Sequence, residues 1–204
     1  MRAGDAGRGS RILPLVRDAR RYTRCRGRGS DTAGASLTLR LMAAGDRDDV
    51  LEFARALSPQ DTLFLRMDIS DPLVVDEWIK NIAAGHTTTV LAYDGKTLAG
   101  FASLHHNEVR WTRHIGEIRT IVGSGYRNMR LGVRLVQEIF AVAKEIGLQK
   151  ITANMTVEQA GARAAFERIG FRPEAVLCDY VIDGEGRTHD MLIMSYDIEG
   201  FNDD

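Results

Sequence analysis

The sequence predicts a one-domain α+β fold (α/β in the wider sense) with six to seven strands flanked by about four helices. Runs rich in β-branched residues are joined by short polar turns such as Asp94-Gly95, which indicate β-hairpins. Other segments repeat apolar residues at helical spacing and end at a glycine, as at Gly147 and Gly170. Together these patterns predict an alternation of strands and helices along most of the chain.

The first part of the predicted domain contains one strand and two helices. Residues 36–42 alternate apolar and polar side chains, as a half-buried strand does. Asp46 is expected to cap a helix that ends before Pro59, and Pro72 to begin a second helix. The predicted apolar faces are Val50, Leu51, Phe53, Ala54 and Leu57 in the first helix and Val75, Trp78, Ile79 and Ile82 in the second.

The second part begins with three strands, at residues 87–93, 97–105 and 114–122, which we expect to form an antiparallel meander. A long helix follows, with apolar residues at Leu131, Leu135, Ile139, Val142 and Ile146. A strand at 150–156 precedes a helix that Thr156 and Gln159 are expected to start as a capping box. The last two strands, 175–182 and 189–198, flank the turn Asp183-Gly184-Glu185-Gly186.

The junction between the third central strand and the long helix is suited to binding phosphate. From Gly123 to Gly132 it reads Gly-Ser-Gly-Tyr-Arg-Asn-Met-Arg-Leu-Gly, which is basic and contains glycine. A strand, turn and helix arranged in this way direct backbone N–H groups and the positive end of the helix dipole at an anion. The alternative is a solvated helix start without a ligand.

The spacing within this junction resembles that of the GNAT N-acetyltransferase superfamily, whose motif is Arg/Gln-x-x-Gly-x-Gly/Ala. Arg127, Arg130 and Gly132 occupy the motif positions, and Val122 precedes Arg127 by five residues, as the strand valine of the family does. Arg130 replaces the first motif glycine. Its guanidinium group could add to phosphate binding or could obstruct it.

A second GNAT signature, Asn-x-x-Ala followed by Tyr-Glu-x-Leu-Gly-Phe, is matched in part. Gln159 replaces the asparagine and Phe166 the tyrosine. The matching residues are Ala162, Glu167, Gly170 and Phe171. The element order over residues 37–198 is also that of the family. The resemblance therefore implies the GNAT fold, with a mixed, mostly antiparallel sheet, and the chain is somewhat similar to the bacterial Pat-type protein lysine acetyltransferase domain.

The resemblance implies an enzyme that moves an acetyl group from acetyl-CoA to a primary amine, either a protein lysine or a small molecule. In the family, the turn binds the pyrophosphate, and N–H groups of the preceding strand bind the thioester carbonyl and the pantetheine. The cofactor-binding residues implied here are Ile121, Val122, Gly123, Arg127, Asn128, Met129, Arg130, Leu131, Gly132, Val133, Gln159 and Phe166.

Glu117 is the predicted catalytic residue, since Pat-type enzymes carry their general base five residues before the strand valine. A carboxylate there could take the proton of the attacking ammonium, directly or through water. Arg119 would share its strand face, and a neighbouring cation weakens a carboxylate as a base. A structural ion pair of Glu117 with Arg119 or with Arg127 is the alternative.

The general acid of the family is the motif tyrosine, and Phe166 cannot donate a proton. Phe166 is expected to lie in the core and to form a wall of the thioester pocket. The leaving thiolate would take its proton from water or from Tyr126, Tyr180 or Tyr196. Since Arg130 and Phe166 both depart from the motifs, the alternative function is an acyl-CoA-binding sensor with weak or no catalysis.

Charge, cysteine content and hydropathy indicate which other kinds of protein and binding site the sequence does not favour. The net charge of −1 gives no sign of general nucleic-acid binding. Cys25 and Cys178 suggest no disulfide framework, and no run of residues has membrane-spanning length, so we expect a cytoplasmic protein. The histidines lack ligand spacing, which predicts no metal site. The sequence is compatible with a homodimer.

Residues 1–36 differ in composition from the predicted GNAT domain, residues 37–204. They contain nine Arg, no Lys and three Asp, a net charge of +6, which leaves −7 for the rest of the chain. We expect a disordered, solvated tail. The alternatives are a targeting peptide and an arginine-rich arm for an acidic partner such as nucleic acid.

Overall fold

The computed structural model describes residues 37–62 and 65–198. The predicted tail, residues 1–36, lies outside the described residues, as do residues 199–204. Within the two described ranges, every helix is too short or too polar to cross a lipid bilayer.

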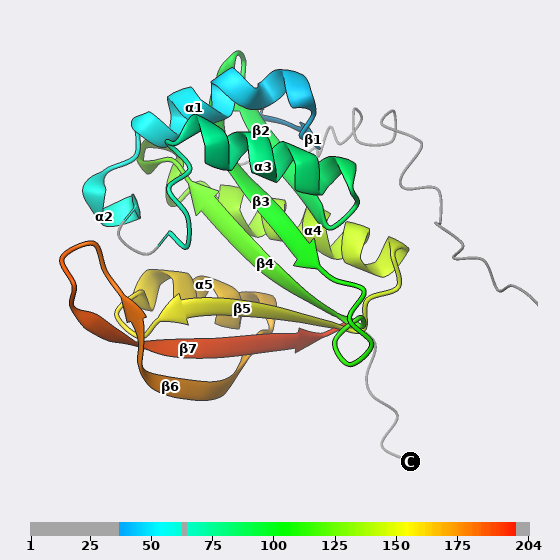
Figure 1. Cartoon of the computed structure of the whole chain (residues 1–204), viewed down its shortest axis with the longest axis vertical. Coiled ribbons are helices and arrows are strands. Elements are labelled where there is room, and N and C mark those ends of the chain that lie inside the picture. The colour runs from blue at the N-terminus through cyan, green and yellow to red at the C-terminus, as the bar shows by residue number, and fades with distance from the viewer. Residues whose placement is uncertain (1–36, 63–64, 199–204) are drawn as a thin grey trace, which may run out of the picture.

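Seven strands form one sheet in the order β1-β2-β3-β4-β5-β7-β6 (Figure 1). All neighbouring strands are antiparallel except β4 and β5, which are parallel. The predicted mixed, mostly antiparallel sheet is confirmed. The strands are β1 (Leu37–Leu41), β2 (Thr87–Asp94), β3 (Thr97–His106), β4 (Ile115–Val122), β5 (Lys150–Thr156), β6 (Arg172–Ile182) and β7 (Thr188–Asp197).

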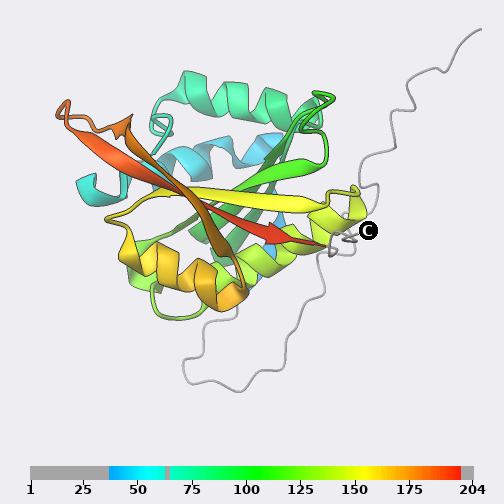
Figure 2. The ribbon, with the colours of Figure 1, turned by 90° about the horizontal axis from the view of Figure 1, so that it is seen from below.

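Helices cover both faces of the sheet, as Figure 2 shows from below. α1 and α3 lie on one face, and α4 and α5 on the other, so the predicted order of helices and strands is confirmed. A short helix, α2, adds to the four predicted ones. The bounds are α1 (Arg47–Arg55), α2 (Pro59–Thr62), α3 (Pro72–Ala83), α4 (Leu131–Glu145) and α5 (Ala160–Ile169).

Two apolar clusters pack the helices against the two faces. On one face, Leu135 of α4 packs in a cluster with Ile118 of β4 and Ile151 of β5. On the other face, the indole of Trp78 of α3 lies 5.0 Å from the ring of Phe101 of β3, centroid to centroid. Burying each such side chain contributes about 1.5–3 kcal/mol. Adjacent residues of β4 therefore face different clusters, which fixes the face of every side chain near the site.

The expected cap of the first helix is wrong in its geometry. The Asp46 side chain is buried and accepts hydrogen bonds from Ala43 N at 2.8 Å and Arg40 Nη1 at 2.6 Å. It thereby closes a 3-10 turn at Ala44–Asp46 in front of α1 and makes no bond to the helix. The buried Asp46 carboxylate needs a counter-charge, and its ion pair with the partly exposed Arg40 of β1 takes it away from the cap.

The sixth strand begins earlier than expected, at Arg172 and not at residue 175. The added residues include Pro173. β6 is an edge strand, where proline is tolerated. Pro173 pairs there with Met194 of β7, next to an irregularity in the register.

Candidate functional site

The parallel strands β4 and β5 separate soon after they meet. Among the described residues, 115–117 of β4 pair with 150–152 of β5, and beyond Thr152 β5 pairs with β7 alone. Figure 1 shows the two strands diverging toward their carboxyl ends. The sheet therefore contains an opening whose edges are backbone.

The edge of β4 at this opening carries N–H groups without a strand partner. Gly123 donates its N–H to Ala99 O of β3 at 2.9 Å. Since N–H groups alternate in direction along an antiparallel ladder, that of Ile121 also faces β3, whereas those of Thr120 and Val122 face the opening. The N–H groups of Gly123 and Ile121, which were expected to face a ligand, are thus directed at β3, and those of Val122 and Thr120 are directed at the opening.

Three buried side-chain oxygen atoms lack a hydrogen-bond partner within the described residues, and all three lie on the separating strands. They are Thr120 Oγ1 on β4 and Asn154 Oδ1 and Thr156 Oγ1 on β5. A buried polar atom left unpaired costs about 1–3 kcal/mol. All three lie on the two strands that border the opening, and a ligand bound there can supply the missing partners.

The turn from β4 to α4 presents a further set of N–H groups. Asn128 and Arg130 both have left-handed backbone conformations, with φ of 63° and 56°. The last residue before the helix, Arg130, accepts the first helical hydrogen bond from Arg134 N at 3.1 Å. The N–H groups of residues 131–133 therefore have no acceptor within α4 and are directed out of its N-terminus.

The left-handed φ of Arg130 gives a physical reason for glycine at this motif position. Glycine adopts this conformation without strain, whereas another residue is destabilised by about 1 kcal/mol. Arg130 is exposed to solvent in this strained conformation. Of the other predicted cofactor residues in this turn, Leu131 lies in the core. The rest are exposed or partly buried: Asn128, Met129, Gly132 and Val133.

Arg127, the first basic residue of the motif, forms an ion pair with Asp61 of α2. Burial disfavours the charge of Asp61, but hydrogen bonds from Ser58 and Arg127 outweigh it and hold the pKa of this carboxyl below its usual value. The Asp61 side chain is 14% exposed and that of Arg127 is 50% exposed. An anion bound at the turn would therefore compete with Asp61 for the guanidinium group.

Glu117, the predicted base, is bound by two guanidinium groups. Arg119 Nε donates to Glu117 Oε1 at 3.0 Å, and Arg66 Nη1 lies 2.9 Å from Oε2. The ion pair with Arg119 that the sequence left open is therefore present, and the one with Arg127 is replaced by the pair with Arg66. The Glu117 side chain is 22% exposed, so it remains accessible at the edge of the opening.

His105 lies beside this cluster on β3, directly opposite Glu117 in the strand register. Its Nδ1 is 3.1 Å from the hydroxyl of Thr87. Burial and the charge of Arg119 lower the pKa of His105 to about 4, so the imidazole is neutral at pH 7. In this cluster the acidic side chain is Glu117, and its neighbours are the two arginines and the neutral His105.

The second motif supports the structure of the site around β5 and α5. Gln159 Oε1 accepts from Thr156 N at 3.0 Å, but α5 begins only at Ala160, so the expected capping box spans a turn and not the first helical turn. Phe166 packs edge-on against Phe171, with ring centroids 4.8 Å apart. Its partly buried ring belongs to the core, as predicted.

The three tyrosines considered as proton donors have different surroundings. Tyr126 donates its hydroxyl to Asp94 Oδ2 at 3.3 Å, at the end of β2. Tyr196 packs against Phe140, with ring centroids 4.8 Å apart. Tyr180 is 62% exposed on the edge strand β6. The Tyr126 hydroxyl is thus bound to Asp94, whereas the structure gives the Tyr196 ring an aromatic contact and leaves Tyr180 on the surface.

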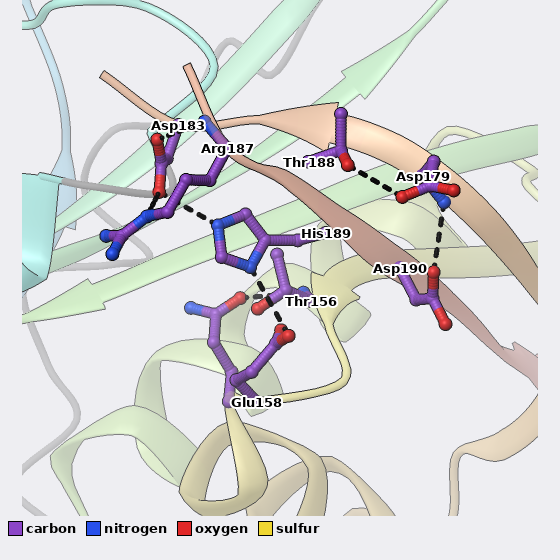
Figure 3. A network of polar contacts seen from close by, with 9 residues as sticks. Thr156, Glu158, Asp179, Asp183, Arg187, Thr188, His189 and Asp190 are labelled. Atoms are coloured by element: carbon purple, nitrogen blue, oxygen red, sulfur yellow. Dashed lines mark hydrogen bonds and ion pairs between the residues drawn. The ribbon is translucent and has the colours of Figure 1, made fainter. Parts of the chain in front are cut away.

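A polar network joins the β6–β7 hairpin to the end of β5 (Figure 3). His189 lies between two carboxylates, with Nε2 2.9 Å from Asp183 Oδ2 and Nδ1 3.3 Å from Glu158 Oε1. Arg187 Nε also donates to Asp183 Oδ2, at 3.1 Å. Because Glu158 lies two residues beyond the end of β5, this network ties the hairpin to the end of that strand.

Sequence reasoning missed Asp61, Arg66 and Asn154. Asp61 and Arg66 lie 66 and 51 residues from their partners Arg127 and Glu117. No local pattern links such distant residues. Asn154 occurs within a predicted strand, and alternation along that strand was the one available signal that it faces away from the core.

Comparison with known proteins identifies the family. The model of the acetyltransferase (GNAT) family matches residues 51–171, more than half of the chain. The chain belongs to the GNAT acetyltransferase family. No curated protein sequence matches it.

Solved structures agree with this GNAT assignment at the level of the fold. A GNAT-family acetyltransferase from Streptococcus pneumoniae has a TM-score of 0.69 and 20% identity, and covers 78% of this chain and 98% of its own. A ribosomal-protein-alanine N-acetyltransferase from Brucella melitensis has a TM-score of 0.69 and 22% sequence identity. The match covers 78% of this chain and 98% of that protein. A Salmonella typhimurium structure with its cofactor acetyl-CoA has a TM-score of 0.72 and 16% sequence identity. The match covers 82% of this chain and 97% of that protein.

Proposed function

We propose that this protein is an acyl-CoA-dependent N-acetyltransferase that moves an acetyl group from acetyl-CoA to a primary amine by direct attack. The observation that carries the proposal is the opening between β4 and β5, with unpartnered polar atoms on both strands and the N-terminus of α4 beside it. A long ligand with a phosphate group at one end and a reactive acyl group at the other fits these features.

The turn and the first residues of α4 would bind the pyrophosphate of CoA. The N–H groups of residues 131–133 and the helix dipole supply hydrogen bonds and positive potential there. Arg127 would exchange Asp61 for a phosphate, which accepts a bidentate guanidinium contact equally well. The Thr120 hydroxyl shares the α4 side of β4 with Ile118, so it is placed to meet the pantetheine.

The N–H groups of Val122 and Thr120 would bind the thioester carbonyl. In direct transfer, the amine nitrogen forms a bond to the carbonyl carbon, and negative charge develops on the carbonyl oxygen. Fixed backbone donors stabilise this charge. The C–S bond then breaks, the amide product leaves, and the CoA thiolate takes a proton from water.

Glu117 would accept the proton that the attacking ammonium must lose. Arg66 and Arg119 both form ion pairs with its carboxylate and therefore occupy its oxygens. The exposed Arg66, 48% accessible in its side chain, is the partner that can move aside for the amine. A protein lysine and a small-molecule amine both remain candidate acceptors, and a homodimer and a cytoplasmic location remain predictions from the sequence.

A second candidate function is an acyl-CoA sensor with weak or no catalysis. The observation that favours it is that Arg127 and Glu117 are both engaged in ion pairs. The strained Arg130 and the hydroxyl-free Phe166 support it further. A sensor needs the CoA site but not a free base.

The test measures CoA binding and turnover together. Calorimetry with CoA is combined with thiol release from acetyl-CoA in the presence of a lysine peptide, an amino acid or spermidine. Binding with amine-dependent thiol release supports the enzyme, and binding without release supports the sensor. A chain that binds neither CoA nor acetyl-CoA would refute both functions.

A further inference from the structure

β5 carries a side-chain amide whose oxygen is buried and unpartnered at the edge of the opening. Asn154 Oδ1 has no hydrogen-bond partner among the described residues. It lies two positions beyond Thr152, where the pairing of β4 and β5 ends. Thr152, on the same strand face, does have a partner, since its hydroxyl donates to Gly116 O at 3.4 Å. The unpaired oxygen thus coincides with the place where the strands separate.

Asn154 faces away from α4. Ile151 and Ala153 of β5 pack in the cluster that contains α4. Because side chains alternate along a strand, Asn154 projects from the opposite face. The pairing of Glu117 with Thr152 puts Glu117 and Asn154 on that same face.

This orientation separates Asn154 from the proposed path of CoA. The turn and the N-terminus of α4 bring CoA to the opening from the α4 side, where the unpartnered hydroxyl of Thr120 lies. A hydrogen-bond donor that reaches Asn154 must come from the face of the sheet opposite α4, the face on which Glu117 would receive a proton. Of the two reactants, the acceptor amine is the one that must approach from there.

On the basis of the proposed N-acetyltransferase function, we propose that Asn154 binds the acceptor amine. Asn154 Oδ1 accepts a hydrogen bond from one N–H of that amine. An amide oxygen neither gives nor takes a proton at neutral pH, so Asn154 orients the amine and does not activate it. One ammonium N–H is held by Asn154, a second proton leaves to Glu117, and the freed electron pair attacks the thioester carbon.

The test replaces the amide by an apolar group of similar size, Asn154→Leu. Removing an unpartnered buried oxygen should leave the melting temperature of the unliganded protein equal or higher. The kcat/KM for the amine should fall roughly 10- to 100-fold, mainly through a higher amine KM, with CoA affinity unchanged in calorimetry. Asn154→Asp keeps an oxygen in place and should restore the amine KM.

Thr152→Val is the matched control, since Thr152 lies on the same face but within the paired part of β5. It should leave the amine KM unchanged. If Asn154→Leu weakens CoA binding and spares the amine KM, the oxygen serves the cofactor and the proposal is overturned. A lower melting temperature with unchanged kcat/KM would instead assign Asn154 a structural role, which also overturns it.

A separate measurement distinguishes this proposal from the proposed function. If the wild type acetylates no amine of the panel, the proposed catalytic function is refuted. The role of Asn154 is then tested by amine binding alone. Millimolar amine added with CoA should raise the melting temperature of the wild type but not that of Asn154→Leu. An equal rise in both proteins, or no rise in either, would refute the assignment.

Discussion

Glu117 has two partners that stabilise its charge, and the same contacts limit its action as a base. Arg119 lies on its own strand, and Arg66 reaches it from the segment between α2 and α3. An amine that enters the opening must replace at least one of these contacts. The reactivity of this residue therefore depends on how readily Arg66 leaves.

Replacing Glu117 by Gln tests the base role. The substitution keeps the size of the side chain but removes proton acceptance, so kcat/KM should fall by about 10²–10⁴ while CoA affinity stays level. The loss should shrink at high pH, where free amine is already abundant. A Gln variant with lower stability but unchanged turnover per folded molecule would mean that Glu117 serves the ion pairs alone.

Replacing Asp61 by Asn tests the competition for Arg127. The change frees the guanidinium and removes a negative charge close to the proposed pyrophosphate site. An exposed ion pair contributes about 0.2–1 kcal/mol, so CoA affinity should rise roughly two- to fivefold. The rise should be largest at low salt, and the exposed Asp68→Asn is the control. Equal or weaker binding by Asp61→Asn would place the pyrophosphate away from Arg127.

At the scale of elements, the N-terminus of α4 combines a helix start with a surface that a ligand can approach. A Cβ added at Gly132 would meet Val122 Cγ2 at 3.6 Å, an ordinary contact distance. The fold therefore does not require glycine there, and a ligand close to the backbone is the remaining reason for a small residue.

Two substitutions at Gly132 separate these effects. Gly132→Ala should keep CoA binding and raise stability by up to about 1 kcal/mol, because alanine favours the helix. Gly132→Glu should fold but lose CoA binding, since it adds bulk and a carboxylate beside the pyrophosphate. Calorimetry and thermal melting measure both quantities. Full CoA affinity in a folded Gly132→Glu would exclude this turn from the site.

The β6–β7 hairpin should respond to pH through His189. Hydrogen bonds to Asp183 and Glu158 raise the pKa of His189, so its contribution to stability is complete below pH about 6.5 and is lost as the pH rises through the raised value. His189, Arg187 and backbone N–H groups lower the pKa of Asp183, whose contribution is present above pH about 4 and is lost on acidification.

Melting temperatures between pH 5 and 9 can detect this dependence. The wild type should lose stability above neutral pH, and His189→Gln should be less stable at pH 5 and should lose less as the pH rises. The exposed His86→Gln should follow the wild-type curve. A His189→Gln variant with the wild-type pH dependence would show that the hairpin does not depend on this histidine.

At the scale of the whole molecule, the opening lies between two parts of one sheet. The strands β1 to β4 meet β5, β7 and β6 through the short β4–β5 contact and through the cluster around α4. A ligand that binds both strands would replace part of the missing pairing. CoA should therefore stabilise the whole domain and not a single loop.

Thermal melting with CoA tests this expectation. A ligand at 100 times its Kd adds about 2.7 kcal/mol to the free energy of unfolding. For a domain of this size, this amounts to a rise of roughly 5–10 °C in melting temperature. Gly132→Glu should show no rise. A loss of CoA stabilisation when residues 1–36 are removed would mean that the predicted tail contributes to the site.

The order of the elements, the hairpins and the position of the turn before α4 could all be predicted from local sequence patterns. These follow from local patterns, such as Asp94-Gly95 in a turn and the apolar spacing from Leu131 to Ile146 in a helix. The family motif could be read for the same reason, because its residues are close together in the chain.

Which side chains meet could be seen only in the folded chain. Arg66 contacts Glu117 and Asp61 contacts Arg127 only after the chain has folded, since more than 50 residues separate the members of each pair. The opening itself depends on where two strands stop pairing, which is a property of register and twist and not of either strand sequence. The unpartnered oxygen of Asn154 becomes visible only when every neighbour of β5 is in place.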